Sequence, residues 1–422
     1  MAPTKPTTSA PALRSLASVA RENSASPWST AQASAPWRAT LEPAVAKALA
    51  LPRIDDVADG AVDAADIVVI GAGIAGLSAA HAASATGART VVLEAASAIG
   101  QGATGRNAGI LSAGINMGLA DLAPDSPERE MWPATTRALL ALVEEAAQPG
   151  AMLSASLTGA LSLAETPAAA RRLVREARTR VALGLRAEIW TPAQVAERTG
   201  GRLDTRRVVQ ALWLPDEGRI HPLTLLARTA AQARAAGAIL VGDAHVERWQ
   251  TRPGNARHAS QWHVRLATGR ELTARGVIVA TGPVATPTAR IYALAYALDL
   301  PDDFPLFWDA APYTYCDYRP GDGRLITSGG RYGLAGGSAR EATYYQRLAR
   351  GAQRWLPELA QTTPTHAWAV DLDVSADLAP RLRGLDERAP GVAIEGLGAL
   401  GVLPGSILGR RAGEQLAQRL NS

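Results

Sequence analysis

Three glycines and one acidic residue have the spacing that binds the diphosphate of a dinucleotide. Gly71, Gly73 and Gly76 follow directly after the apolar, β-branched run 66–70, and Glu94 lies 23 residues after Gly71. The first glycine permits a tight turn, the second lets the backbone approach a pyrophosphate, and the third lets helix and strand pack closely. Backbone N–H groups at the start of a helix attract phosphate, and Glu94 can accept hydrogen bonds from ribose hydroxyls. The stretch therefore predicts a nucleotide-binding turn.

The elements around these residues have the order of a βαβ unit. Residues 66–70 predict a strand, Gly87 ends the expected helix, and residues 90–93 predict the next strand. A membrane helix over residues 67–83 is the alternative, since this stretch is mostly apolar with small residues at four-residue spacing. His81, the glycine cluster and the missing cationic anchor argue against a span, which needs about 20 apolar residues. We expect a soluble βαβ unit and no membrane span.

Composition limits the class of protein and its partners. Hydrophobic residues make up 47% and charged residues 19% of the 422-residue chain, which suits about two to three structural units with ample core. The net charge is +4, but no basic run with interleaved aromatic residues is present, so we expect no nucleic-acid partner. The single cysteine, Cys316, excludes an intrachain disulfide and a cysteine-rich metal site. We expect no metal, and a cytoplasmic location.

Residues 1–63 precede the βαβ unit and are expected to form an N-terminal extension that is partly disordered. Residues 1–30 are rich in Ala, Ser, Thr and Pro, and they lack the apolar stretch that a secretory signal requires. An Arg-bearing transit peptide around residues 12–21 is one interpretation, and a disordered or loosely attached tail is the other.

Two further segments carry glycines where a strand ends. Residues 276–280 predict a buried strand that runs into Thr281 and Gly282, and residues 396–405 form a glycine-rich turn after another strand. Because ligands bind at the carboxyl edge of open α/β sheets, these segments and the first glycine turn are expected to build one site. We expect an α/β fold with a Rossmann-like nucleotide-binding domain assembled from three chain segments, and an α+β substrate domain with a mainly antiparallel sheet. The expected ranges are 64–118, 205–285 and 385–422 for the first domain, and 119–204 and 286–384 for the substrate domain.

Periodicity and capping residues predict further elements. Residues 167–183 predict a helix with Leu173, Ala177 and Val181 on one stripe, and Thr191 is the expected N-cap of the next helix. The other expected helices cover 134–147, 223–236 and 340–355, and the last one starts near Gly405. Residues 312–319 and 324–330 predict an antiparallel pair around a Pro-Gly-Asp-Gly turn.

Together these motifs resemble the FAD-dependent D-amino-acid-oxidase-type superfamily, in the branch of glycine oxidase, sarcosine oxidase and gamma-glutamylputrescine oxidase. The resemblance covers about residues 64–420 and rests on the βαβ unit, the GATGRNAG loop at 102–109, the strand ending ATG at 280–282 and the glycine-rich segment 396–409. It implies FAD, with the ADP half on the βαβ unit and the isoalloxazine between the two domains.

The resemblance also implies which residues hold FAD. The pyrophosphate would lie on the glycine turn, the ribose on the acidic residue, the adenine against a backbone position, and the flavin against the loop and the last helix. The pyrophosphate residues are Gly71, Gly73, Ala75 and Gly76, the ribose residue is Glu94, and the adenine residue is Val246. The flavin residues of the loop are Thr104, Arg106, Asn107, Ala108, Gly109 and Leu111, and those at the last helix are Gly401, Val402, Leu403 and Pro404. Gly282, which ends the middle strand, is a further cofactor-binding candidate. The alternatives are an ordinary solvated loop at 106–107 and a plain β-to-α turn at 401–405.

Candidate groups for the reacting end lie near the expected hairpin. Tyr318 matches a substrate-facing tyrosine, and Cys316 resembles a cysteine that bonds covalently to the flavin in sarcosine oxidase; packing and an unreactive buried thiol are the alternatives. Arg331 could pair with a substrate carboxylate or lie on the surface. Trp308 is a candidate cavity wall. His221 could act as a base, but its position before Pro222 favours helix capping.

The resemblance implies oxidation of a C–N bond in a small amine or amino acid. Hydride would pass to the flavin, the imine would hydrolyse, and electrons would go to O2. One departure concerns the acceptor: sarcosine oxidase has a lysine at the position of Leu403, whereas this chain contains only Lys5 and Lys47. Two alternatives stay open, a dehydrogenase of the same fold that feeds a quinone or carrier, and a flavin-binding subunit that needs a partner chain. The oligomeric state is not indicated.

Overall fold

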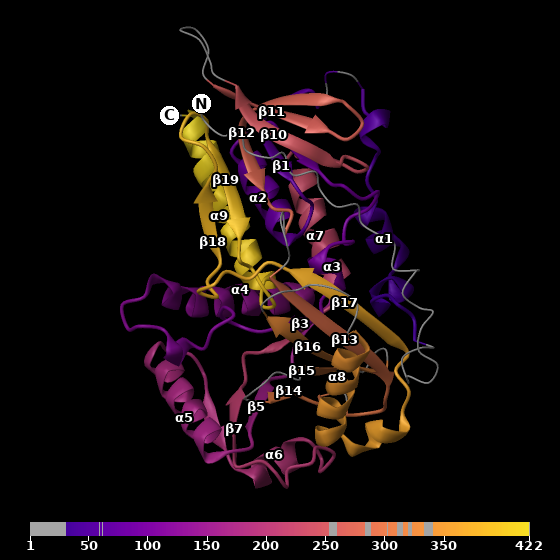
Figure 1. Ribbon diagram of the computed structural model, residues 1–422, viewed down its shortest axis with the longest axis vertical. Coiled ribbons are helices and arrows are strands. Elements are labelled where there is room, and N and C mark those ends of the chain that lie inside the picture. Colours follow the sequence, from indigo (N-terminus) through magenta and orange to yellow (C-terminus); the bar gives the residue numbers. More distant parts are fainter. Residues whose placement is uncertain are drawn as a thin grey trace, which may run out of the picture.

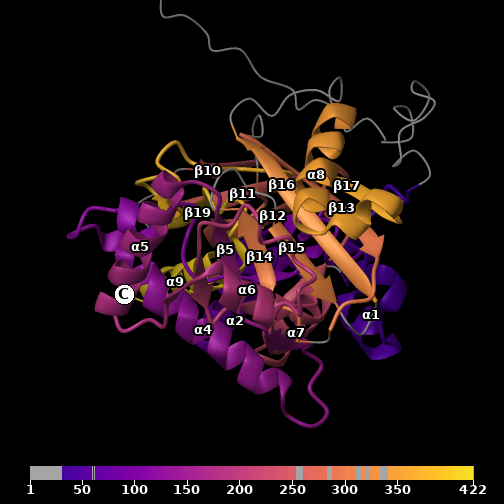
Figure 2. The same ribbon diagram turned by 90° about the horizontal axis from the view of Figure 1, so that it is seen from below.

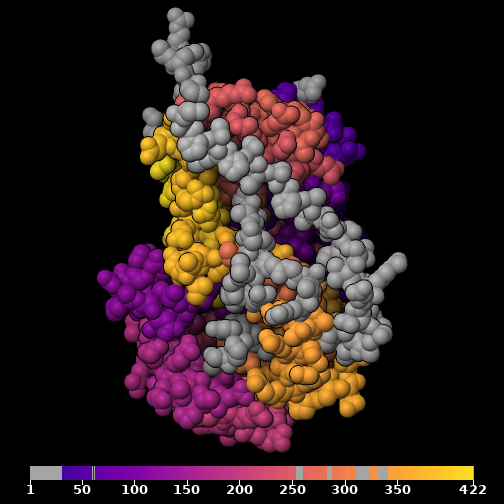
Figure 3. Space-filling view, in the orientation of Figure 1, coloured from indigo at the N-terminus to yellow at the C-terminus, as the bar shows by residue number. Residues whose placement is uncertain are grey.

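The computed structural model describes residues 31–58, 60, 62–252, 260–282, 288–301, 303–309, 315–319, 323–332 and 341–421, with only the backbone of 315–319 and 331–332. The chain forms an elongated molecule in which two large sheets lie one above the other (Figure 1). The space-filling view shows the same division, with the C-terminal helix along one edge of the upper half (Figure 3).

The first sheet is mainly parallel and contains the glycine turn. Its strand order is β10-β11-β12-β1-β2-β9, and β19 and β18 continue it from β12. The strands are β1 (Ala64–Ile70), β2 (Thr90–Leu93), β9 (Ile239–Val241), β10 (Val246–Arg252), β11 (Gln261–Leu266), β12 (Glu271–Val279), β18 (Arg381–Gly384) and β19 (Gly391–Glu395). β1 pairs in parallel with both β12 and β2, and β19 joins β12 in parallel. The carboxyl ends of these strands therefore meet at one edge of the sheet.

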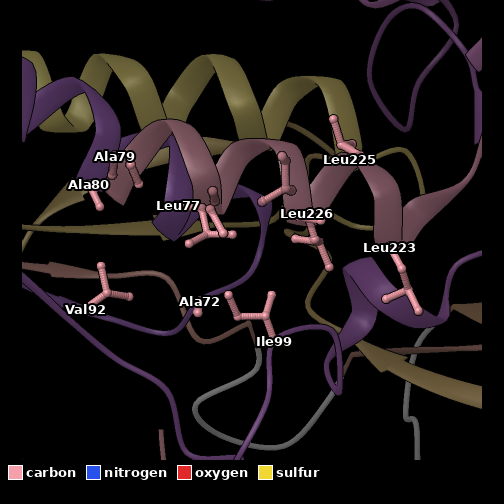
Figure 4. Close-up of a cluster of buried hydrophobic side chains, with 14 of the residues drawn as sticks. Ala72, Leu77, Ala79, Ala80, Val92, Ile99, Leu223, Leu225 and Leu226 are labelled. Atoms are coloured by element: carbon pink, nitrogen blue, oxygen red, sulfur yellow. The ribbon is translucent and has the colours of Figure 1, made fainter. Parts of the chain in front are cut away.

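Three long helices pack together against this sheet. They are α2 (Ile74–Ala85), α7 (Pro222–Ala235) and α9 (Val402–Asn421). α2 and α9 lie side by side because Gly409 and Gly413 bring α9 against the carbonyl oxygens of Ala75 and Ala79, where a methyl group would overlap. Figure 4 shows the apolar layer beside α2, in which Leu77 lies among buried side chains that include Leu226.

The second sheet is mainly antiparallel, as the sequence predicts. Its order is β17-β13-β16-β15-β14-β5-β7-β6, and only the β14–β5 pair is parallel. The strands are β5 (Ala160–Ala164), β6 (Glu188–Trp190), β7 (Gln210–Leu214), β13 (Ala289–Ala297), β14 (Leu306–Asp309), β15 (Tyr315–Arg319), β16 (Arg324–Tyr332) and β17 (His366–Leu372). Helix α8 (Glu341–Trp355) packs on β13 and β16 (Figure 2).

The remaining elements of the described chain are a small sheet, five further helices and several 3-10 turns. A small sheet joins β3 (Ile110–Leu111), β8 (Gly218–Ile220) and β4 (Ala155–Leu157). The helices are α1 (Pro43–Leu49), α3 (Ala103–Arg106), α4 (Met131–Ala146), α5 (Pro167–Ala182) and α6 (Pro192–Arg198). Of these, α5 packs on β5, β6 and β7 of the second sheet. Single 3-10 turns are η2 (Pro36–Thr40), η3 (Ile54–Asp56), η4 (Leu119–Asp121), η5 (Pro127–Glu130) and η8 (Pro357–Gln361).

Local signals predicted these elements well, with two exceptions. Thr191 caps α6 in a capping box, as expected, and β15 and β16 form the expected hairpin strands. Val181 is 57% exposed, so its place on the buried stripe of α5 was wrong, although Leu173 and Ala177 are buried. Helix α9 begins at Val402 rather than near Gly405. Gly405 lies inside the helix, where its small size permits close packing against Ile74 and Leu397, so it does not mark the helix start.

The described part of the N-terminal extension is well packed. η2, α1 and η3 follow each other along the chain, and Trp37, Leu49 and Ile54 are fully buried. The backbone of Gln32 pairs with β17 of the second sheet, with Gln32 N–H donating to the Thr365 carbonyl at 2.9 Å. Residues 31–57, which we term the N-terminal segment, thus contact both sheets.

Candidate functional site

One large cavity extends from the carboxyl edge of the first sheet to the inner face of the second. Its volume is about 2750 Å³. The three glycine-bearing strand ends that the sequence singled out all contribute to its wall, together with strands of the second sheet. Chain segments that are distant in sequence therefore meet at one site, whose volume has room for a dinucleotide and a small molecule.

The glycine turn has the close packing that its spacing predicts. Gly71 adopts φ +103°, and a side chain there would meet the Ala280 carbonyl oxygen at 2.7 Å. A methyl group at Gly76 would overlap the Gly71 carbonyl oxygen, so the third glycine lets α2 cross the turn. Glu94 accepts hydrogen bonds from Ala72 N–H at 2.8 Å and Ala96 N–H at 3.1 Å. The carboxylate is thereby fixed on the cavity wall beside the N-terminus of α2.

Loop 102–109 closes against this turn. The Asn107 side chain donates to the Thr104 carbonyl and accepts from Gly109 N–H, both at 2.8 Å. Thr104 Oγ1 in turn accepts from Ile74 N–H at 3.3 Å, at the first residue of α2. The loop and the helix start therefore form one backbone surface along the cavity, which fits a bound diphosphate and disfavours an ordinary solvated loop.

The start of α9 is held by a residue that sequence reasoning missed. The Asn116 side chain donates to the Leu397 carbonyl at 3.1 Å and accepts from Ala399 and Leu400 N–H at 2.9 and 3.2 Å. One amide thus satisfies three backbone groups of the turn that precedes α9. Gly401, where this turn reaches the helix, lines the cavity, so the N-terminal amides of α9 are available to an anionic group there.

A single row of paired residues crosses the second sheet beneath the cavity. The register aligns Leu212 with Ser162, Ser162 with Trp308, Ser328 with Ala293, and Ala293 with Trp368. Paired residues share a face of a sheet, and all of these line the cavity. This floor is mostly apolar, with two hydroxyl groups. It suits a small molecule with an apolar part and one or two polar groups.

A buried ionic group fixes the loop that borders the floor. Glu217 is 1% exposed and accepts from Ala113 N–H at 2.9 Å and from Arg180 at 3.4 Å. Arg180 also donates to Glu176 at 2.8 Å, and Glu176 accepts from Ala120 N–H at 2.8 Å. Burial raises the pKa of Glu217. The network ties α5 to the segment that follows loop 102–109, and Arg180 is shared between the two carboxylates.

Arg106 is a partly buried cation on the cavity wall, in loop 102–109, which closes against the glycine turn. Burial lowers the pKa of its guanidinium, while the nearby Asp371 carboxylate acts in the opposite direction. Within the described part of the chain, its Nε has no hydrogen-bond partner. An arginine in this position remains charged and can face an anion in the cavity.

Most of the predicted residues line this cavity. Those that do are Gly71, Gly73, Ala75, Glu94, Thr104, Arg106, Asn107, Ala108, Val246, Gly282, Trp308, Gly401, Val402 and Leu403. Gly76, Gly109, Leu111 and Pro404 are buried directly behind the wall. His221 lies at the N-cap of α7 without a side-chain capping bond and stacks edge-on against Trp37.

For the candidate residues on strands β15 and β16, Cys316, Tyr318 and Arg331, the structure describes the backbone pairing only. Cys316 pairs with Phe307 and Thr327, and Tyr318 pairs with Leu325, all of which are buried in the core. Arg331 pairs with Arg290, which binds Asp371 at 2.7 Å. The side chains of Cys316, Tyr318 and Arg331 lie outside the described residues.

Among the described residues, no group of three or more His, Cys, Asp or Glu side chains is placed to hold a metal ion. No helix in the described ranges combines the length and the apolar character needed to cross a membrane.

Comparison with known proteins agrees with this arrangement. The family model described as DAO, FAD dependent oxidoreductase, matches residues 66–415. No curated protein matches the sequence significantly. Glycine oxidase from Geobacillus kaustophilus has a similar structure, with a TM-score of 0.70, 20% identity, and coverage of 85% of this chain and 95% of that chain.

Two other solved structures share the fold. L-proline dehydrogenase from P. horikoshii has a TM-score of 0.67 at 18% identity, over 82% of this chain and 93% of that chain. Iminodiacetate oxidase from Chelativorans sp. BNC1 has a TM-score of 0.64 at 21% identity, over 83% of this chain and 94% of that chain.

Proposed function

Because the chain belongs to the DAO family of FAD-dependent oxidoreductases, we propose that it oxidises a C–N bond in a small amine or amino acid. The observation that carries the proposal is the continuous cavity, which joins the glycine turn to the floor of Trp308, Ser162 and Ser328. The similar structures are named for glycine, iminodiacetate and proline, each of which carries an oxidisable C–N bond.

One set of cavity residues would bind the cofactor, and another set would bind the substrate. FAD supplies, when bound, an acceptor for a hydride from the carbon beside nitrogen. Gly71, Gly73 and the start of α2 would hold the diphosphate, and Glu94 the adenosine ribose. The N-terminal amides of α9 would stabilise negative charge on the flavin edge, since a helix start favours an anion.

The floor of the cavity would orient the substrate. Trp308 and Trp368 form apolar walls that exclude water, and the hydroxyls of Ser162 and Ser328 can hydrogen-bond a polar group of the substrate. No acid–base constellation is required, because positioning supplies most of the rate when a neutral amine gives up a hydride. Tyr318 and Arg331 have no part in this proposal, because their strand partners Leu325 and Arg290 do not line the cavity.

Oxygen is the proposed electron acceptor, and a quinone or protein carrier is the second candidate. One observation supports the second candidate: Leu403, which the resemblance to sarcosine oxidase aligns with a lysine, is 1% exposed and lines the cavity. Turnover with measurement of peroxide against dye reduction separates the two.

The proposal is tested by anaerobic titration of the FAD-loaded protein. The panel contains glycine, sarcosine, iminodiacetate, L- and D-proline and putrescine; glycolate and betaine, which lack an oxidisable amine, serve as controls. We expect loss of the flavin absorbance with at least one amine and with neither control. Bleaching by glycolate alone, or by no amine, contradicts the proposal. In a Trp308→Leu variant, KM for the active amine should rise while the Kd for FAD stays constant.

A further inference from the structure

Two tryptophans donate hydrogen bonds to adjacent carbonyl groups of loop 102–109. Trp37 Nε1–H donates to the Asn107 carbonyl at 2.9 Å, and Trp368 Nε1–H donates to the Arg106 carbonyl at 2.8 Å. The two indoles are 1% and 4% exposed. Trp37 comes from η2 in the N-terminal segment, whereas Trp368 comes from β17 in the second sheet. Two parts of the chain that are distant from the loop thus hold the same short stretch of its backbone.

Each of these carbonyls matters because the loop borders an anion site. A peptide carbonyl carries partial negative charge and repels a phosphate, while the N–H groups of the same loop attract it. A glycine-rich loop can turn either group toward the cavity. An indole donor that occupies the carbonyl fixes the peptide plane, and a buried donor without its acceptor is costly, so each contact favours one loop conformation.

The held conformation is transmitted to the diphosphate end of the cavity. Asn107, whose carbonyl accepts from Trp37, also bonds Thr104 and Gly109 through its side chain. Thr104 Oγ1 then accepts from Ile74 N–H at the start of α2. A continuous set of hydrogen bonds therefore leads from Trp37 to the helix N-terminus.

The N-terminal segment is itself anchored on both sides of the loop. Gln32 exchanges backbone hydrogen bonds at 2.9 Å with Thr365 and Ala367, next to Trp368. Arg38 donates to the Ile99 carbonyl at 3.0 Å, just before the loop. The family match begins at residue 66, so Trp37 belongs to a part of the chain outside it.

We propose that Trp37 and Trp368 are positioning residues for FAD, whose indole N–H groups hold the Arg106 and Asn107 peptide units in the conformation that accepts the cofactor. The N-terminal segment is then a working part of the cofactor site. The inference rests on the FAD of the family and is independent of the substrate and of the electron acceptor.

The test compares three Trp→Phe variants that each remove one indole N–H and keep a buried ring. Trp262→Phe is the matched control, because Trp262 is 3% exposed and donates to the Pro390 carbonyl at 2.8 Å, away from the cavity. The Kd of the FAD-free full-length protein for FAD is measured by flavin fluorescence. We expect an increase of about three- to tenfold for W37F and W368F, and less than about twofold for W262F. W37F is decisive, because Trp37 does not line the cavity.

A second readout separates loop positioning from general destabilisation. Trypsin can cleave the Arg106–Asn107 bond, and mass spectrometry follows this cleavage in the FAD-free proteins. We expect W37F and W368F to accelerate cleavage at Arg106 selectively, while W262F does not. Wild-type Kd in W37F, an equal change in W262F, or acceleration spread evenly over all arginines would overturn the proposal.

A measurement on the wild-type protein covers the case in which W37F does not fold. Amide hydrogen exchange of the FAD-free protein reports the Gly109 N–H, which bonds the Asn107 side chain. We expect this amide to be protected before FAD is added. Exchange at the rate of an open chain would show that the loop is not held, and would refute the role of both tryptophans.

Discussion

Replacing Gly76 by alanine sets two physical effects against each other. Alanine stabilises a helix interior by about 1 kcal/mol relative to glycine, so helix propensity alone predicts a more stable protein. The new methyl group, however, would overlap the Gly71 carbonyl oxygen and lie 3.1 Å from the Gly71 carbonyl carbon and 3.3 Å from Val69 Cγ1. The nearest of these atoms belong to the backbone, which has no side-chain rotamer to relieve the overlap.

The steric effect should win. Overpacking costs about 1–3 kcal/mol, and the upper end applies where the overlapped atom is backbone. Subtracting the helix gain leaves a net loss of about 2 kcal/mol, or about 2 °C in Tm for a chain of 422 residues. Because α2 must move away from the Gly71 turn, the Kd for FAD should rise by at least about tenfold.

Gly384→Ala is the matched control, since a methyl group there meets nothing within 4 Å and Gly384 is not at positive φ. Tm is measured by calorimetry on the FAD-free proteins, and Kd by flavin fluorescence. We expect Gly384→Ala to match the wild type in both. A Gly76→Ala protein with unchanged or raised Tm and wild-type FAD affinity would refute the reasoning about the turn.

Further predictions concern other contacts. Asn116→Leu removes three hydrogen bonds from the turn before α9 and should raise the Kd for FAD about fivefold by fluorescence titration. Asn116→Asp keeps the oxygen that accepts from Ala399 and Leu400 N–H and loses only the bond to the Leu397 carbonyl, so its effect should be smaller. Equal effects of the two variants would contradict this role. Glu94→Gln leaves one backbone N–H facing an amide NH2 and should weaken FAD binding about tenfold; wild-type affinity would exclude Glu94 from the site. Burial lowers the pKa of His366 below 6.5, so the unfolded chain takes up a proton that the folded chain does not, and stability should fall as the pH drops through about 6.5. Between about pH 7.5 and pH 5.5 the Tm of His366→Gln should fall less than that of the wild type, and parallel curves would contradict the assignment.

The nucleotide-binding part of the fold could be predicted because its signals are local. Gly71, Gly73 and Gly76 lie within six residues, and Gly76 is required by its contact with the Gly71 carbonyl in the same βαβ unit. Thr191 likewise identified the start of α6 through its own side chain. The third glycine-rich segment was located correctly, but the start of the helix that follows it was predicted about three residues too late. Gly405 and Gly409 serve helix packing, which a single segment does not reveal.

The contacts that shape the site could not be predicted, since they join residues that are far apart in sequence. Trp37 and Trp368 lie 70 and 262 residues from their partners in the loop, and Asn116 lies 281 residues from Leu397. The sequence around a tryptophan or an asparagine does not indicate which distant backbone group its side chain will hydrogen-bond. The floor of the cavity depends on strand register, and alternation within one strand does not give the register of its neighbours.

The central claim is that the cavity binds FAD and that the bound flavin accepts electrons from an amine. The most direct measurement starts from FAD-free protein, adds one equivalent of FAD, and then adds the amine panel without oxygen while the flavin absorbance is recorded. We expect a bound flavin spectrum that at least one amine bleaches and that glycolate leaves intact. Protein that does not retain FAD, or bound flavin that no amine reduces, would contradict it.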